Sequence, residues 1–121
     1  MVNFWTNNAF VFPGMGLGAI VAEARAVTDR MFLLAARELA AEVTHERLAA
    51  GALYPQVASL RAVSRRIAVA VAREAADAGL SGAAEHGAFD PETEVDAAMW
   101  WPEYVPYTPA RAVERRRRAE A

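Results

Sequence analysis

The chain has 121 residues, a formal net charge of −2 and a hydrophobic content of 55%. This length supports at most one domain, and the weakly acidic balance gives no reason to expect nucleic acid or a membrane surface as a partner. The sequence contains no cysteine and no lysine, which excludes disulfides, thiolate metal sites and catalysis by a lysine of this chain.

The N-terminal part predicts a short strand followed by a helix. Phe10-Val11-Phe12 combines aromatic and β-branched residues, which favour an extended strand. Pro13 then suits the first turn of a helix, because its ring holds φ near the helical value. The alanine-rich stretch that follows predicts a helix over about residues 17–27.

Two helices with clear start signals follow. Thr28 is a good N-cap for a helix over about residues 29–43. Thr44 caps a short helix that is predicted to end at residue 50, because Gly51 follows as a typical helix-terminating glycine. The first of these helices is predicted to bury one apolar stripe, which consists of Phe32, Ala36, Leu39 and Val43.

A long helix is predicted over about residues 59–78, with Gly79 as its stop. The polar and acidic stretch 81–96 shows neither helical nor strand periodicity and is predicted to be a loop. Residues 99–109 form an aromatic and proline-rich tail that we expect to be extended, because its prolines interrupt any regular element. The predicted fold is therefore mostly α, with one short strand and an extended aromatic tail.

The glycines near the N-terminus permit two interpretations. Gly14-Met15-Gly16-Leu17-Gly18-Ala19 matches the dinucleotide pattern G-x-G-x-x-G/A. That pattern also requires a second strand with an acidic residue about 20 positions later, but helices are predicted there. We therefore expect these glycines to allow close packing of a helix rather than to bind phosphate.

Four segments in the same order carry a resemblance to a known family. They are Asn7-Asn8 with Phe12-Pro13-Gly14 and Leu17-Gly18, then Val27-Thr28-Asp29-Arg30-Met31-Phe32, then Gly51-Ala52-Leu53-Tyr54-Pro55, and finally Val63-Ser64-Arg65-Arg66-Ile67-Ala68. Together they resemble the C-terminal part of malic enzymes over roughly residues 7–80. The resemblance implies the C-terminal helical portion of a Rossmann-like α/β NAD-binding domain at residues 1–80, with an acidic loop and tail at 81–121.

The resemblance also implies a parent activity, the oxidative decarboxylation of malate to pyruvate with NAD or NADP and Mg²⁺ or Mn²⁺. It implies that Asn7 and Asn8 line the substrate pocket, and Asn7 is the favoured contact. An amide suits this role because it donates to a carboxylate and accepts from a hydroxyl without adding charge. The alternative is a purely structural role, in which the two asparagines form a turn.

No catalytic residue and no metal ligand is assigned in this chain. The family's lysine base, metal carboxylates and phosphate-binding glycines are implied to lie upstream, so we expect no cofactor to bind this chain alone. His45 and His86 are too far apart in sequence to form a typical ligand pair. The cofactor-binding residues are left unassigned.

We therefore expect a fragment or subunit of a malic enzyme that is inactive alone and located in the cytoplasm. Its expected partners are a second copy or a complementing N-terminal part. The alternative is a small helical interaction module that binds a protein through Trp100, Trp101, Tyr104 and Tyr107. Large aromatic side chains in an extended tail favour burial against some surface.

Overall fold

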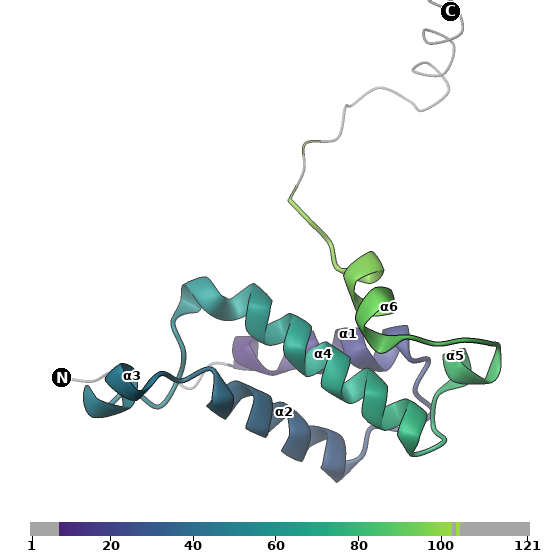
Figure 1. The fold of residues 1–121 in the computed structure, drawn as a ribbon, viewed down its shortest axis with the longest axis horizontal. Helices are drawn as coiled ribbons and strands as arrows, with labels where there is room; N and C mark the ends of the chain where they lie inside the picture. Colours follow the sequence, from purple (N-terminus) through teal and green to yellow (C-terminus); the bar gives the residue numbers. More distant parts are fainter. Residues whose placement is uncertain (1–7, 103, 105–121) are drawn as a thin grey trace, which may run out of the picture.

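The computed structural model describes residues 8–102 and 104, and this part of the chain is mostly helical (Figure 1). Its α-helices are α1 (Phe12–Val21), α2 (Asp29–Ala41), α3 (His45–Ala49), α4 (Leu60–Asp77), α5 (Gly82–Glu85) and α6 (Pro91–Ala98). Two single 3₁₀ turns, η1 (Asn8–Phe10) and η2 (Val57–Ser59), precede α1 and α4. The prediction of a mostly α fold is confirmed.

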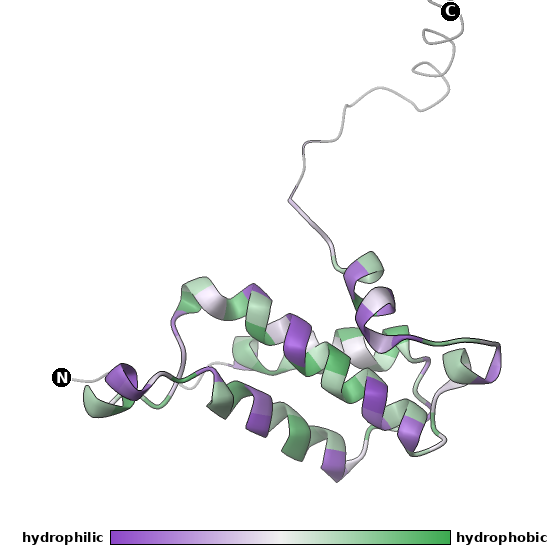
Figure 2. Ribbon diagram, viewed as in Figure 1, coloured by the Kyte–Doolittle hydropathy of each residue, from purple (hydrophilic) through white to green (hydrophobic). Residues whose placement is uncertain are grey.

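Helix α4 is the centre of the structure, and α1, α2 and α6 all pack against it. Figure 1 shows α4 as the longest helix, with α2 below it, α1 behind it and α6 above its right half. The hydropathy colours in Figure 2 alternate along α4, because apolar turns are interrupted by strongly polar positions. Its buried residues are Val63, Ser64, Ile67, Ala68, Val69, Val71, Ala72 and Ala75.

Helices α1 and α4 approach each other closely at two glycines. A Cβ atom on Gly14 would lie 2.7 Å from the Ser64 carbonyl oxygen, and one on Gly18 would lie 2.5 Å from the Ala68 carbonyl oxygen. Gly14 and Gly18 are four residues apart and therefore share one face of α1. Gly16 lies elsewhere on the helix, where a Cβ would meet nothing within 4 Å. The expectation that the glycines serve helix packing is confirmed for Gly14 and Gly18.

The predicted strand at residues 10–12 is wrong. Residues Asn8–Phe10 form η1, and α1 begins at Phe12 and ends at Val21, earlier than the predicted helix over 17–27. Strand propensity has no effect without a neighbouring strand to satisfy the backbone groups, and Pro13 in the first turn favours the helix instead. Helix α1 ends early because Glu23 adopts a left-handed conformation, with φ of 49°.

Helix α2 begins and ends close to the prediction, but its buried face differs. Thr28 accepts a hydrogen bond from the Met31 amide, as expected of an N-cap. The buried residues are Met31, Ala35 and Leu39, whereas Phe32 is 46% exposed. The predicted stripe shares only Leu39 with this face, because the choice between two adjacent apolar stripes depends on where α4 lies.

The predicted helix ends at glycines are confirmed. Gly51 follows α3 and Gly79 follows α4, with φ of 78° and 68°. The left-handed conformation costs little at glycine, which has no Cβ. At Gly79 it allows the Leu80 amide to bond back to the Ala75 carbonyl at 2.8 Å, which satisfies an acceptor at the end of α4.

The prediction of a loop over residues 81–96 is wrong. Ser81 caps α5 and accepts a hydrogen bond from the Ala84 amide at 3.0 Å. Asp90 caps α6 in the same way through the Thr93 amide, and Pro91 occupies the first turn. The sequence Asp90-Pro91-Glu92 is a recognisable helix start, although the helix that follows has only one buried residue, Val95.

Hydrogen bonds also join the segment after α4 to the end of α1. Ser81 is 2% exposed, and its hydroxyl donates to the Ala22 carbonyl at 2.8 Å. An isolated antiparallel bridge joins Ala24 to Ser81, and the Arg25 amide donates to the Leu80 carbonyl at 3.0 Å. These bonds hold the end of α1 and the start of α5 together.

The close approach of α1 and α4 predicts opposite effects for two glycine substitutions. Gly18→Ala should lower the free energy of unfolding by about 1–3 kcal/mol, because the new methyl group overlaps the backbone at Ala68. Gly16→Ala should raise it by about 0.5–1 kcal/mol, because alanine favours the helix and the position is open. Urea denaturation followed by circular dichroism measures both, and equal effects from the two variants would contradict this packing.

Candidate functional site

The two asparagines predicted to bind substrate are described only in part. Asn7 lies outside the described residues. Asn8 is the first residue of η1, and its side chain is exposed. It lies at the rim of an open cavity of about 370 Å³.

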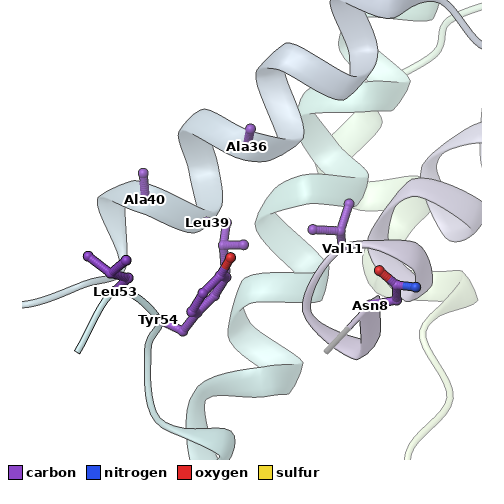
Figure 3. A pocket seen from close by; sticks show the side chains of 7 residues that line it. All are labelled: Asn8, Val11, Ala36, Leu39, Ala40, Leu53 and Tyr54. Carbon is purple, nitrogen blue, oxygen red and sulfur yellow. The ribbon is translucent and has the colours of Figure 1, made fainter. Parts of the chain in front are cut away.

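The cavity lies between the start of α1, the C-terminal half of α2 and the loop that follows α3. Figure 3 shows Asn8 at one end and Leu53 at the other, with Tyr54 and Leu39 between them. Apart from Asn8, the described residues that line it are Val11, Ala36, Leu39, Ala40, Leu53 and Tyr54.

Packing on both sides holds the cavity walls in place. The ring of Tyr54 stacks on that of Phe10, with centroids 6.0 Å apart. The Arg47 guanidinium donates to the Tyr54 carbonyl at 2.8 Å, which fixes the loop against α3. Leu39 is buried in the core, so α2 contributes a rigid wall.

The cavity offers few polar groups. Asn8 supplies an amide and Tyr54 a phenol, and none of the described lining residues is charged. A dicarboxylate needs cationic or metal partners to compensate for its lost hydration. These residues therefore provide orienting hydrogen bonds and an apolar wall, but not the charge that an anionic ligand requires.

The sequence predicts a pocket role for Asn8, which lines this cavity, but names none of the other lining residues as site residues. Tyr54 lies in one of the four segments that carry the resemblance, but the sequence assigns it no role in a pocket. Ala36 and Ala40 lie one turn apart on the exposed side of α2. Small apolar residues give no local signal for a cavity, because their role depends on which elements surround them.

The described residues do not fit the metal and nucleotide of the resembled family. No group of three or more histidine, cysteine, aspartate or glutamate side chains in residues 8–102 and 104 could hold a metal ion. Gly14 and Gly18 pack against α4, so their open Cα faces are not free to approach a pyrophosphate. We therefore assign no metal or nucleotide contact to these residues.

A second, shallow hollow of about 160 Å³ lies on α4 beside α2 and α6. Arg65, Arg66 and Arg73 surround it, and each is paired with a carboxylate. Arg65 binds Asp96 at 2.5 and 2.7 Å, Arg73 binds Glu92 at 3.1 Å, and Arg66 contacts both Glu38 and Glu42. These carboxylates neutralise the cations, so the hollow is an ion-pair surface.

The pKa shifts occur on this surface and at the start of α6. Hydrogen bonding from Arg65 lowers the pKa of Asp96, and the same contact raises the pKa of Arg65. The pKa of Asp90 is lowered mainly by its hydrogen bonds with Thr93 at the N-terminus of α6. In both aspartates the folded structure favours the ionised carboxylate.

Comparison with known proteins agrees with the resemblance in the sequence. The profile of the family described as "Malic enzyme, NAD binding domain" matches residues 3–76. This is more than half of the chain, and the chain therefore belongs to the malic enzyme family.

Curated proteins with similar sequences are named as NAD- or NADP-dependent malic enzymes. The chain is 41% identical over 101 residues to the NAD-dependent malic enzyme of Photorhabdus laumondii, and 43% identical over 81 residues to NADP-dependent malic enzyme 1 of Arabidopsis thaliana. These matches cover 84% and 67% of this chain. They cover only 18% and 14% of the relatives, so the chain spans less than a fifth of the length of either protein.

The lowered pKa of Asp96 predicts how the attachment of α6 depends on pH. Because the folded pKa lies below the unfolded value of about 3.9, the stabilisation is present above that value and is lost as pH falls through the folded pKa. An NMR titration should give an Asp96 midpoint below about 3.9. Arg65→Gln should raise this midpoint towards about 3.9, and an unchanged midpoint in that variant would contradict the assignment to Arg65.

Proposed function

We propose that this chain is the C-terminal helical portion of a malic enzyme NAD-binding domain and contributes the wall and amides of the substrate pocket. In the parent enzyme this would serve oxidative decarboxylation of malate to pyruvate. The observation that carries the proposal is the position of Asn8 at the cavity between α1, α2 and the loop at Leu53 and Tyr54. Asn7, the adjacent amide, is proposed to share the role.

The chemistry of the pocket supports the proposal that this chain supplies part of a substrate site rather than a complete site. The Asn8 amide is exposed and has both a donor and an acceptor, which suits the hydroxyl and carboxylate of a hydroxy acid. The cationic partners, a lysine base, the divalent metal and NAD or NADP would come from the rest of a malic enzyme. When bound in that enzyme, the nucleotide would supply a hydride acceptor and the metal would supply Lewis-acid polarisation of the substrate oxygens.

We propose that residues 1–80 are the part that belongs to this domain and that residues 81–121 are an appendage to it. Within the described residues, no helix is both long enough and apolar enough to cross a membrane. The cytoplasm is the proposed location. The proposed partner is a malic enzyme part that contains the metal and nucleotide sites, and the chain alone is proposed to be inactive.

Complementation tests this function. The chain alone should not reduce NAD or NADP in the presence of malate with Mg²⁺ or Mn²⁺. It should restore activity to the Photorhabdus laumondii NAD-dependent malic enzyme from which the matching segment has been deleted. In the restored enzyme, Asn8→Ala should lower kcat/KM for malate by about 10- to 100-fold, the effect of about 1.4–2.8 kcal/mol of lost binding.

Arg37→Gln is the matched control, because Arg37 lies on the exposed surface of α2, the helix that supplies Ala36 and Ala40. It should leave kcat/KM unchanged. Asn7→Ala distinguishes the two amides, since the residue that contacts malate should show the larger loss. Turnover by the chain alone, or activities of both Asn7→Ala and Asn8→Ala equal to that of the control, would contradict the proposal.

The aromatic tail is proposed to bind a second copy or another part of the enzyme. Trp100 is 73% exposed, Trp101 is 59% exposed and Tyr104 is fully exposed, whereas Tyr107 lies outside the described residues. Each aromatic side chain has roughly 150–250 Å² of surface that association could bury. The described tail extends beyond α6 (Figure 1) and contacts α4 through Arg61, which donates to the Trp100 carbonyl and lies 4.3 Å from the centroid of the Trp101 ring.

Removal of the tail should therefore reduce self-association. Light scattering should show the intact chain as a dimer or larger species, and a chain that ends at Ala98 should shift towards the monomer. Replacement of Trp100 and Tyr104 by alanine should produce most of the same shift, because these two side chains expose the most aromatic surface. A monomeric intact chain at all concentrations would rule out the tail as a self-association site.

A further inference from the structure

Residues 90–101, which comprise the Asp90 cap, helix α6 and the aromatic residues after it, share one mode of attachment. We propose that this segment is a releasable strap, held to α4 by a row of arginines and able to detach as a unit while the other helices remain folded. This inference is independent of the proposed function.

The contacts of the strap form a ladder along one helix. Arg73 pairs with Glu92 at 3.1 Å, and Arg65 forms two hydrogen bonds with Asp96 at 2.5 and 2.7 Å. Arg61 donates to the Trp100 carbonyl, and its guanidinium lies 4.3 Å from the centroid of the Trp101 ring. From Arg73 through Arg65 to Arg61 the residue numbers decrease along α4, whereas those of the contacted residues increase along the strap. The strap therefore runs antiparallel to α4.

Apolar burial contributes little to the attachment. Val95 is the only buried residue of α6, although the helix touches both α1 and α4. By comparison, α2 buries Met31, Ala35 and Leu39 against the same core. Exposed ion pairs are weak individually and are screened by salt. A helix with one buried side chain and exposed ion pairs therefore belongs to the least stable part of the fold.

The hydrogen bonds of the strap favour release as a unit. Asp90 caps α6 from within the segment, through the Thr93 amide and hydroxyl. The cap therefore remains intact when the arginine contacts break. The Arg61 Nε is buried without a hydrogen-bond partner, and release of the Trp101 ring would open this atom to water.

Release would free two surfaces together. The arginine face of α4 would lose its carboxylate partners, and the exposed pair Trp100 and Trp101 would separate from Arg61. Ionic strength controls the process, because the Debye length falls from about 30 Å at 0.01 M to about 3 Å at 1 M salt. Low salt would hold the strap on α4, and high salt would favour the detached state.

Hydrogen exchange of the full chain tests the proposal residue by residue. At low salt, the amides of residues 94–98 should exchange at least about tenfold faster than the most protected amides of α4, as expected of a separate opening unit. A rise to about 1 M NaCl should widen this ratio. Arg65→Gln should widen it about two- to fivefold at low salt, the range that one exposed ion pair supports.

A second readout follows the aromatic end of the strap. The side-chain protons of Arg61 lie over the Trp101 ring and should show a ring-current shift, which should decline with salt in parallel with the protection of α6. Arg30→Gln is the control, since it removes an ion pair of comparable length, Arg30 to Glu74 at 2.9 Å, that joins α2 to α4. It should leave the exchange ratio unchanged.

Three results would each contradict the proposal that the strap opens separately. If α6 and α4 exchange at the same rate, they open only together and the strap is not a separate unit. If Arg65→Gln and Arg30→Gln have equal effects on α6, the arginine row does not hold it. If added salt leaves the ratio and the Arg61 shift unchanged, ion pairs do not control the release. Each result would overturn the proposal.

Discussion

The close contact between Gly14 and Gly18 of α1 and the backbone of α4 is the constraint on which the rest of the structure depends. A side chain at either glycine would overlap atoms of Ser64, Ile67, Ala68 or Val71, so the distance between the helices is set by the absence of two Cβ atoms. With the helices at this distance, Asn8 faces α2 across the cavity, and Ala22 lies where the Ser81 hydroxyl reaches its carbonyl. A core rich in alanine buries little area per residue, and close backbone approach compensates by increasing the number of atomic contacts.

Helix α4 holds its neighbouring helices by two kinds of contact, apolar packing and exposed polar pairs. Its apolar residues bind α1 and α2 through an apolar core that includes Val63, Ile67 and Val71, to which α6 adds only Val95. Its arginines bind α6 and the first aromatic residues of the tail through exposed polar contacts. The two attachments differ in their physical sensitivity, since salt and acid weaken ion pairs whereas apolar packing resists both. The N-terminal helices and the strap therefore respond differently to the same change in conditions.

The cavity at Asn8 follows from the same arrangement. One wall belongs to α2, another to the start of α1, and the third to a loop that Arg47 and Phe10 hold through Tyr54. The cavity has hydrogen-bonding groups and an apolar surface but no charged side chain among its described lining residues. Membership of the malic enzyme family explains this composition if the charged groups are supplied by another part of the enzyme, as we propose.

The sequence by itself determined the family, the helical class and the ends of α2, α3 and α4. These properties depend on local chemistry, such as the caps at Thr28 and Thr44 and the glycines after α3 and α4. It also selected Asn8 through a resemblance, although not the cavity beside it. Only the tertiary structure decided that residues 10–12 are not a strand, that α2 buries Met31 rather than Phe32, and that Val95 anchors a helix in a polar segment. The physical reason is that strand pairing, the choice of a buried face and the burial of a single valine all depend on which distant residue lies opposite, and no local pattern contains that information.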